Sequence, residues 1–333
     1  MAQLNGTNKI LQCTSHLVLG IIFFFGTLLY GQDQVMADSL EFIYNSDQFE
    51  EKDRLQLLYE LAVYNPDPDK SLRFSKELLN RAIEADSIEH VIGAYQEIGS
   101  ALRLKGDLNH ALESLFNGVK LAEEEELKRE LGILYINIGT VYAAMDDQRN
   151  AVLNYKKASA IHKAENDSMH YAKALENLGV FYNENLNKPD SALLFFKQSG
   201  NIFGIQDYKY GIASNLGNIG LAYALKGENN IAENNINRAT KLFEELGEYF
   251  PISVYLTYMS DIYANRGDWD AAFGYAHRSL DLALQYGLKK QIGDSYRKLS
   301  ELYEKKGNTT EALKYHKNYV IYRDSVNNIE KVR

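Results

Sequence analysis

The sequence contains few of the residues and motifs that covalent or metal chemistry requires. Cys13 is the only cysteine among 333 residues, so the chain forms no internal disulfide and offers no thiolate cluster to a metal. It contains no HExxH, GxxxxGK[ST], GxGxxG or GxSxG motif. These absences argue against catalysis, and we predict neither an enzyme nor a bound cofactor.

Proline is also rare, with four residues in the whole chain, whereas tyrosine occurs 24 times. Proline interrupts helices because it lacks a backbone donor and clashes with the preceding turn. Tyrosine is only a moderate helix former, so its abundance indicates packing between helices. We therefore predict an all-α protein with long helices.

Positive charge is in deficit, because 36 Lys and Arg residues face 45 Asp and Glu residues and give a net charge of −9. A protein that binds nucleic acid needs a concentrated basic face. No such face is visible in the sequence. We expect a protein or peptide partner and no nucleic acid.

One long apolar run, Leu17 to Gly31, lies near the amino terminus. Its length of about 14 residues suits the central region of a signal peptide and falls short of the roughly 20 residues that a membrane span needs. Residues 1–31 are therefore predicted to be a signal peptide of an exported, periplasmic bacterial protein. The alternative is an uncleaved leader, which would be the only attachment to the membrane.

The strongest pattern is a repeat of about 40 residues. A small residue recurs at spacings of 40, 40, 41, 40 and 40, and a second small residue follows each one by twelve or thirteen positions. The first set is Gly99, Gly139, Gly179, Gly220, Ser260 and Ser300, and the second is Ala111, Ala151, Ala192, Ala232, Ala272 and Ala312. The turn residues between them are Gly106, Asp146, Gly227, Gly267 and Gly307. Each unit is predicted to be two antiparallel helices that touch at the small residues and are joined by a left-handed turn.

A degenerate first unit begins at Leu55, with Ala62 and Ser71 at the small positions. We therefore predict about seven units over residues 55–325, a capping helix region in residues 32–54, and the end of the terminal helix in residues 326–333. Stacked in register, such pairs form a right-handed α-solenoid, a superhelix of antiparallel helix pairs.

The segments INIGTVY, ENLGVFY and GNIGLAY resemble the tetratricopeptide repeat, which carries a small residue and an aromatic on each helix. The period resembles that of its longer variety, found in signalling scaffolds and regulators, and not the usual 34 residues. The resemblance implies a scaffold that binds a peptide or partner protein in its concave groove. An exported array of this kind also resembles the sensor part of bacterial signalling proteins. The alternative function is therefore a sensory portion whose kinase, cyclase or DNA-binding output lies outside this sequence.

Three asparagines occupy one place in consecutive units, two residues before the small residue: Asn137, Asn177 and Asn218. The resemblance implies a ladder that hydrogen-bonds an extended peptide, since an amide offers donors and an acceptor. Bonds within the scaffold itself are the alternative. The predicted groove also contains Lys173, Glu176 and Arg297. Because these charges are of mixed sign, we expect no uniformly charged ligand.

Two further features remain to be placed. His162 and His170 are expected to bracket a loop between units, and we interpret them as an accidental pair and predict no metal site. Tyr315, Tyr319, Tyr322, Val326 and Ile329 form an apolar stripe of two heptads, too few for a coiled coil. We predict that this stripe caps the last unit, and a homodimer through the terminal helix is the alternative.

The mature amino terminus tests the leader prediction. Cleavage after Gly31 would place a small residue before the cut, as signal peptidases require, and the mature chain would begin at Gln32. We expect mass spectrometry of the protein from the periplasmic fraction of a bacterial host to find this terminus. An intact leader in the membrane fraction would instead show an anchor.

Overall fold

The structure is a computed structural model that describes residues 33–326. The predicted leader, residues 1–31, and Ile329 of the apolar stripe lie outside this range. The described residues form fifteen α-helices and one short 3-10 helix, with no strand among them. The prediction of an all-α protein is confirmed.

Seven helix pairs follow α2 (Asp33–Asn45) and the 3-10 helix η1 (Glu51–Asp53). The first helices are α3 (Arg54–Tyr64), α5 (Ile88–Leu104), α7 (Lys128–Ala144), α9 (Ser168–Glu184), α11 (Lys209–Leu225), α13 (Tyr249–Asn265) and α15 (Lys289–Lys305). The second helices are α4 (Pro68–Glu84), α6 (Leu108–Glu124), α8 (Gln148–Ala164), α10 (Pro189–Ile205), α12 (Asn229–Leu246), α14 (Trp269–Gln285) and α16 (Thr309–Val326).

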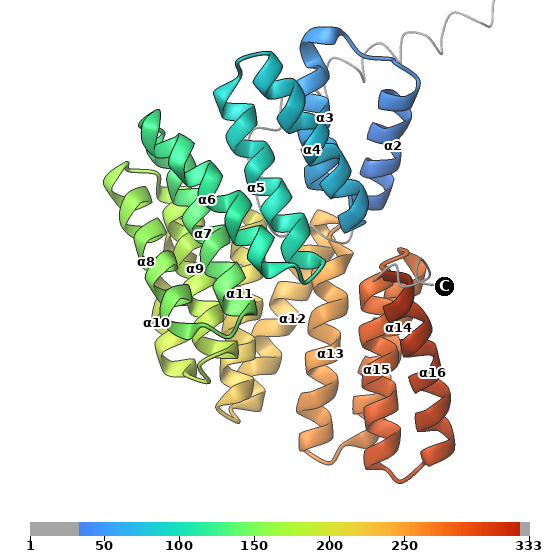
Figure 1. The fold of residues 1–333 in the computed structure, drawn as a ribbon. Helices are drawn as coiled ribbons and strands as arrows, with labels where there is room; N and C mark the ends of the chain where they lie inside the picture. Colours follow the sequence, from blue (N-terminus) through green and yellow to red (C-terminus); the bar gives the residue numbers. More distant parts are fainter. Residues whose placement is uncertain (1–32, 327–333) are drawn as a thin grey trace, which may run out of the picture.

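The pairs stack in chain order into a solenoid. Each helix packs on its neighbours in the chain, and the first helices of successive pairs also contact one another. The stack curves, so that α2 to α4 and α14 to α16 appear on the same side of the view in Figure 1. The predicted α-solenoid of helix pairs is confirmed. None of the helices within residues 33–326 is long and apolar enough to cross a membrane.

The small residues of each unit meet as the repeat predicted. A methyl group added to Gly220 would lie 3.0 Å from the carbonyl oxygen of Ala232, its partner on α12. In the seventh pair, Ser300 Oγ donates to the carbonyl oxygen of Ala312 at 2.9 Å. The spacing of twelve residues between the two small positions is therefore the length of chain that runs from the contact point on the first helix, through the turn, to the contact point on the second helix.

The turns use the left-handed conformation. The residues predicted for the turns within pairs all have positive φ: Gly106 at 79°, Asp146 at 59°, Gly227 at 76°, Gly267 at 80° and Gly307 at 75°. The single spacing of 41 has a local cause. Four residues, 185–188, join α9 to α10, whereas three residues join the helices of the neighbouring pairs. The extra residue lies in the turn, so the helices keep their register.

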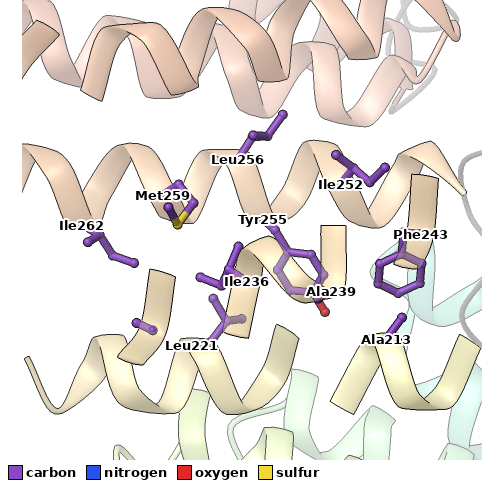
Figure 2. Close-up of a cluster of buried hydrophobic side chains, with 11 residues drawn as sticks. Ala213, Leu221, Ile236, Ala239, Phe243, Ile252, Tyr255, Leu256, Met259 and Ile262 are labelled. Atoms are coloured by element: carbon purple, nitrogen blue, oxygen red, sulfur yellow. The ribbon is translucent and has the colours of Figure 1, made fainter. Parts of the chain in front are cut away.

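The core runs between the layers of helices. In Figure 2, Ile236 and Phe243 of α12 lie between side chains of α11 and α13, including Leu221 and Met259. Neither helix of a pair covers its own apolar face, so each pair needs its neighbours to exclude water.

The terminal helix covers the last pair. The Tyr315 ring lies 5.3 Å from the Tyr303 ring of α15, and the Tyr322 ring lies 5.6 Å from that of Tyr296. These contacts confirm the predicted capping role for the first part of the stripe. A homodimer through this helix stays a prediction.

Replacing Gly220 with alanine tests the close contact within a pair. The added methyl would also meet Ile236 Cγ1 at 2.6 Å, and overpacking costs about 1–3 kcal/mol. This cost exceeds the gain of about 0.5–1 kcal/mol that alanine brings to a helix. We expect Gly220→Ala to lower the free energy of unfolding measured with urea.

Gly274→Ala is the matched control, because Gly274 lies inside α14 and an added methyl meets no atom within 4 Å. This variant should be more stable than the parent by about 0.5–1 kcal/mol. Equal stabilisation by both substitutions would contradict the close contact.

Candidate functional site

Titratable groups with pKa values shifted by burial gather on the first helices. Burial is the main cause of a raised pKa at four carboxyl groups and of a lowered pKa at one ammonium group on these helices. These are Glu60, Glu97, Glu176 and Glu184, and Lys173. On second helices and turns, hydrogen bonds dominate the pKa shifts of Asp107, His110, Asp147, Lys226 and Lys314. Among the described helices, the first helices of successive pairs contact one another, whereas the second helices of successive pairs do not. The first helices therefore lie on the inner side of the curve, which we call the inner face.

Glu184 lies on the inner face near the end of α9. Its side chain is exposed to solvent, yet burial by the surrounding protein raises the pKa of its carboxyl group. Glu184 on α9 also raises the pKa of Tyr258 on α13, a helix of the next pair but one. The curvature therefore brings the fourth and sixth pairs near each other.

Tyr258 lies among acidic groups of three helices. It is 37% exposed, and its pKa rises to about 12 because of burial and of the nearby Glu184, Asp261 and Asp294. Neither Glu184 nor Tyr258 was predicted for the site. The position of Tyr258 could have been found from the sequence, since it lies two residues before the small residue of its unit, as the three asparagines do. The environment of Glu184 could not, because it depends on the curvature.

Glu176 is a buried carboxyl group among the predicted site residues. It is 8% exposed, and its Oε1 accepts a hydrogen bond of 3.1 Å from Nδ2 of Asn218. Burial raises its pKa to about 7, although hydrogen bonds from Ser214 and Asn218 and the charge of Lys173 act in the opposite direction. At neutral pH this carboxyl group can therefore either donate or accept a hydrogen bond.

The three asparagines do not share one environment. Asn218 links α11 to α9 through Glu176, which is the scaffold bond that the alternative interpretation expects. Asn137 is 6% exposed, and its Nδ2 has no hydrogen-bond partner among the described residues. Asn177 is half-buried on α9. The peptide ladder thus stays a prediction, and at Asn218 the side chain already serves the scaffold.

The predicted cations lie at two places along the inner face. Lys173 is half-buried on α9, where its Nζ lies 5.9 Å from the centre of the Tyr208 ring, and burial lowers its pKa. Arg297 is exposed on α15 and pairs with Asp294 at 3.4 Å. Charges of both signs therefore occur along the inner face.

A second cluster lies where α8 meets α9. His162, near the end of α8, and His170, in the first turn of α9, bracket the turn of residues 165–167, as predicted. Their rings stack with centroids 5.1 Å apart. Asp167, the N-cap of α9, lies between them, with Oδ2 2.8 Å from His170 Nδ1 and 3.8 Å from His162 Nδ1. Asp167 was missed, although its spacing of three residues from His170 is visible in the sequence.

Comparison with solved structures places this fold among helical-repeat proteins. Aspartyl phosphate phosphatase F from Bacillus subtilis is similar over 95% of this chain and 89% of its own, with a TM-score of 0.63 and 14% identity. The Rap conjugation gene regulator of plasmid pLS20, solved with a Phr peptide, is similar over 83% and 76%, with a TM-score of 0.60 and 15% identity.

The Cut9–Hcn1 hetero-tetramer of the APC/C is similar over 96% of this chain and 54% of its own, with a TM-score of 0.57 and 13% identity. No protein-family model matches the chain, and no curated protein sequence matches it. At these identities the likeness shows the fold, a solenoid of the tetratricopeptide type, as the sequence predicted.

The raised pKa of Glu176 predicts a pH-dependent stability. In the unfolded chain this carboxyl group ionises near pH 4.5, whereas in the folded protein it ionises near pH 7. Its contribution is therefore fully present below pH 4.5 and is lost as the pH rises through 7. We expect Glu176→Gln to gain stability relative to the parent between about pH 5 and 8, by on the order of 3 kcal/mol.

Urea unfolding at several pH values measures this difference. Glu113→Gln, a change at an exposed residue of α6, is the control and should show no such gain. A difference between the parent and Glu176→Gln that stays constant with pH would contradict the assignment.

Proposed function

We propose that this protein is an exported scaffold that binds an extended peptide, or an extended segment of a partner protein, along the inner face of its solenoid. The observation that carries this proposal is the gathering of polar groups with burial-shifted pKa values on that face. Burying such groups costs stability unless they are paired, and sites where pKa values are perturbed are often functional.

The inner face has the chemistry that a peptide backbone needs. An extended peptide presents N–H and C=O groups that only hydrogen bonds can satisfy. Asn177 offers an amide, and Glu176 offers a carboxyl group that donates or accepts near neutral pH. Tyr258 adds a partly exposed aromatic ring, and the exposed carboxylate of Glu184 suits a basic side chain or an amino terminus.

The likeness to the pLS20 regulator supports the same proposal. That protein was solved with a peptide bound, and its fold matches this chain with a TM-score above 0.5. The shared architecture supplies a long curved surface in both proteins, while the residues that recognise a peptide must be those of this chain.

Export and signalling are proposed on different grounds. Export to the periplasm rests on the apolar run of residues 17–31, and any membrane attachment rests on the same leader. The sensory alternative rests on the terminal stripe. Because Tyr315 and Tyr322 pack on α15, capping already accounts for that part of the stripe, and we favour the scaffold.

Alanine substitution of the three asparagines tests the peptide site. An array of random decapeptides would first identify sequences that bind the parent protein. We expect Asn137→Ala, Asn177→Ala and Asn218→Ala together to weaken binding to those peptides by at least about tenfold, since each lost hydrogen bond is worth about 0.5–1.5 kcal/mol.

Three exposed asparagines of the second helices provide the matched control: Asn201, Asn234 and Asn237. Their replacement by alanine should leave binding unchanged. Circular dichroism must show equal helix content in both triple variants. Unaltered affinity of the inner-face variant would overturn the ladder, and an array without any specific binder would count against a peptide ligand.

A further inference from the structure

We propose that His162, Asp167 and His170 form a binding site for a divalent transition-metal ion, with zinc as the best fit. The inference does not rest on the proposed peptide binding, because this cluster involves the junction of α8 and α9. One potential ligand atom from each residue lies within 4.8 Å of the others, and no other cluster of at least three such residues occurs within residues 33–326.

The geometry is close to that of a zinc site. Zinc binds imidazole nitrogen and carboxylate oxygen at about 2.0–2.2 Å in a tetrahedron, which places ligand atoms roughly 3.3 Å apart. Asp167 Oδ2 lies 2.8 Å from His170 Nδ1 and 3.8 Å from His162 Nδ1, on either side of that value. Small rotations of the side chains would therefore bring the three ligands into place.

The cluster breaks the pattern of the repeat at a core position. His162 lies eleven residues after the small residue of its second helix, where five of the other units place a buried apolar residue and the last unit has the exposed Arg323. The buried counterparts are Ala82, Ala122, Phe203, Phe243 and Ala283, each at most 1% exposed. Asp167 stands where two other units have Leu127 and Leu288. No other unit brings an imidazole and a carboxylate to both positions.

His162 itself shows why a ligand is needed there. The side chain is fully buried, and neither Nδ1 nor Nε2 has a hydrogen-bond partner among the described residues. An unsatisfied buried polar group is costly. The His162 ring fits only because residue 132 of α7 is a glycine. A methyl group on Gly132 would lie 2.5 Å from His162 Nε2. A metal bound at Nδ1 would give that nitrogen the partner it lacks.

Two positively charged side chains near the cluster lower its affinity for a metal ion. Arg129 Nε lies 3.3 Å from Asp167 Oδ2, and the charge of Lys173 acts on His170. A bound metal would compete with Arg129 for the carboxylate. Three protein ligands from α8 and α9 would tie the third pair to the fourth and leave one tetrahedral position for water or a fourth ligand.

Zinc titration of the purified, chelator-treated protein tests the site. We expect isothermal titration calorimetry with Zn²⁺ to show one equivalent bound, and Co²⁺ to give the visible absorption bands of a tetrahedral complex. His162→Leu and Asp167→Asn should each weaken Zn²⁺ binding by at least about tenfold. Asparagine keeps the helix cap, so the second variant separates metal binding from folding. Arg129→Gln should bind Zn²⁺ more tightly.

His110→Ala is the matched control, because His110 Nδ1 lies 2.8 Å from Asp107 Oδ1 in the same i,i+3 arrangement but without a second histidine. It should bind Zn²⁺ like the parent. Absence of binding, or binding unaffected by both His162→Leu and Asp167→Asn, would overturn the site. If the variants fail to fold, X-ray absorption at the zinc edge of the parent decides: two imidazoles and a carboxylate support the site, and any other set refutes it.

Discussion

The close approach of two helices within each pair is the constraint on which the rest of the structure depends. It requires a residue without a large side chain at both contact points, as at Gly220 and Ala232. At two of the positions where serine replaces glycine or alanine, its hydroxyl donates to the opposite backbone, as Ser71 does to Ala62 at 2.7 Å and Ser300 to Ala312 at 2.9 Å. A fixed separation within pairs lets the pairs stack at a constant interval. The curvature, and with it the inner face, follows from that stacking.

The inner face carries polar groups that a scaffold built only for stability would avoid. The carboxyl groups of Glu97 and Glu176 both have pKa values raised to about 7 by burial, so each opposes folding when it is ionised. An apolar or amide side chain at either position would avoid this cost. Natural proteins keep such costs where function needs them. This cost on the inner face is consistent with the peptide binding that we propose there.

The repeat was predictable because it is local. Helix pairing, the left-handed turns and the capping contact of Tyr315 all follow from residues within one unit or two adjoining ones. The environment of Glu184 was not predictable, because it arises from the bend across three pairs. Asp167 at the junction of α8 and α9 was missed for another reason. His162 and His170 could be noted from the sequence, but their contact with Asp167 depends on the register of both helices at the turn between the two pairs.

The type of residue at the left-handed turns differs between the two halves of the described chain. Up to Asp207, all of them except Gly106 carry side chains, as at Glu126 and Asn166, whereas from Gly227 onward every one is glycine. A side chain in this conformation stores about 1–2 kcal/mol of strain in the folded state, while glycine gives up more backbone freedom on folding. That entropic cost grows with temperature. Warming therefore raises the cost of the turns more in the carboxy-terminal pairs than in the amino-terminal pairs.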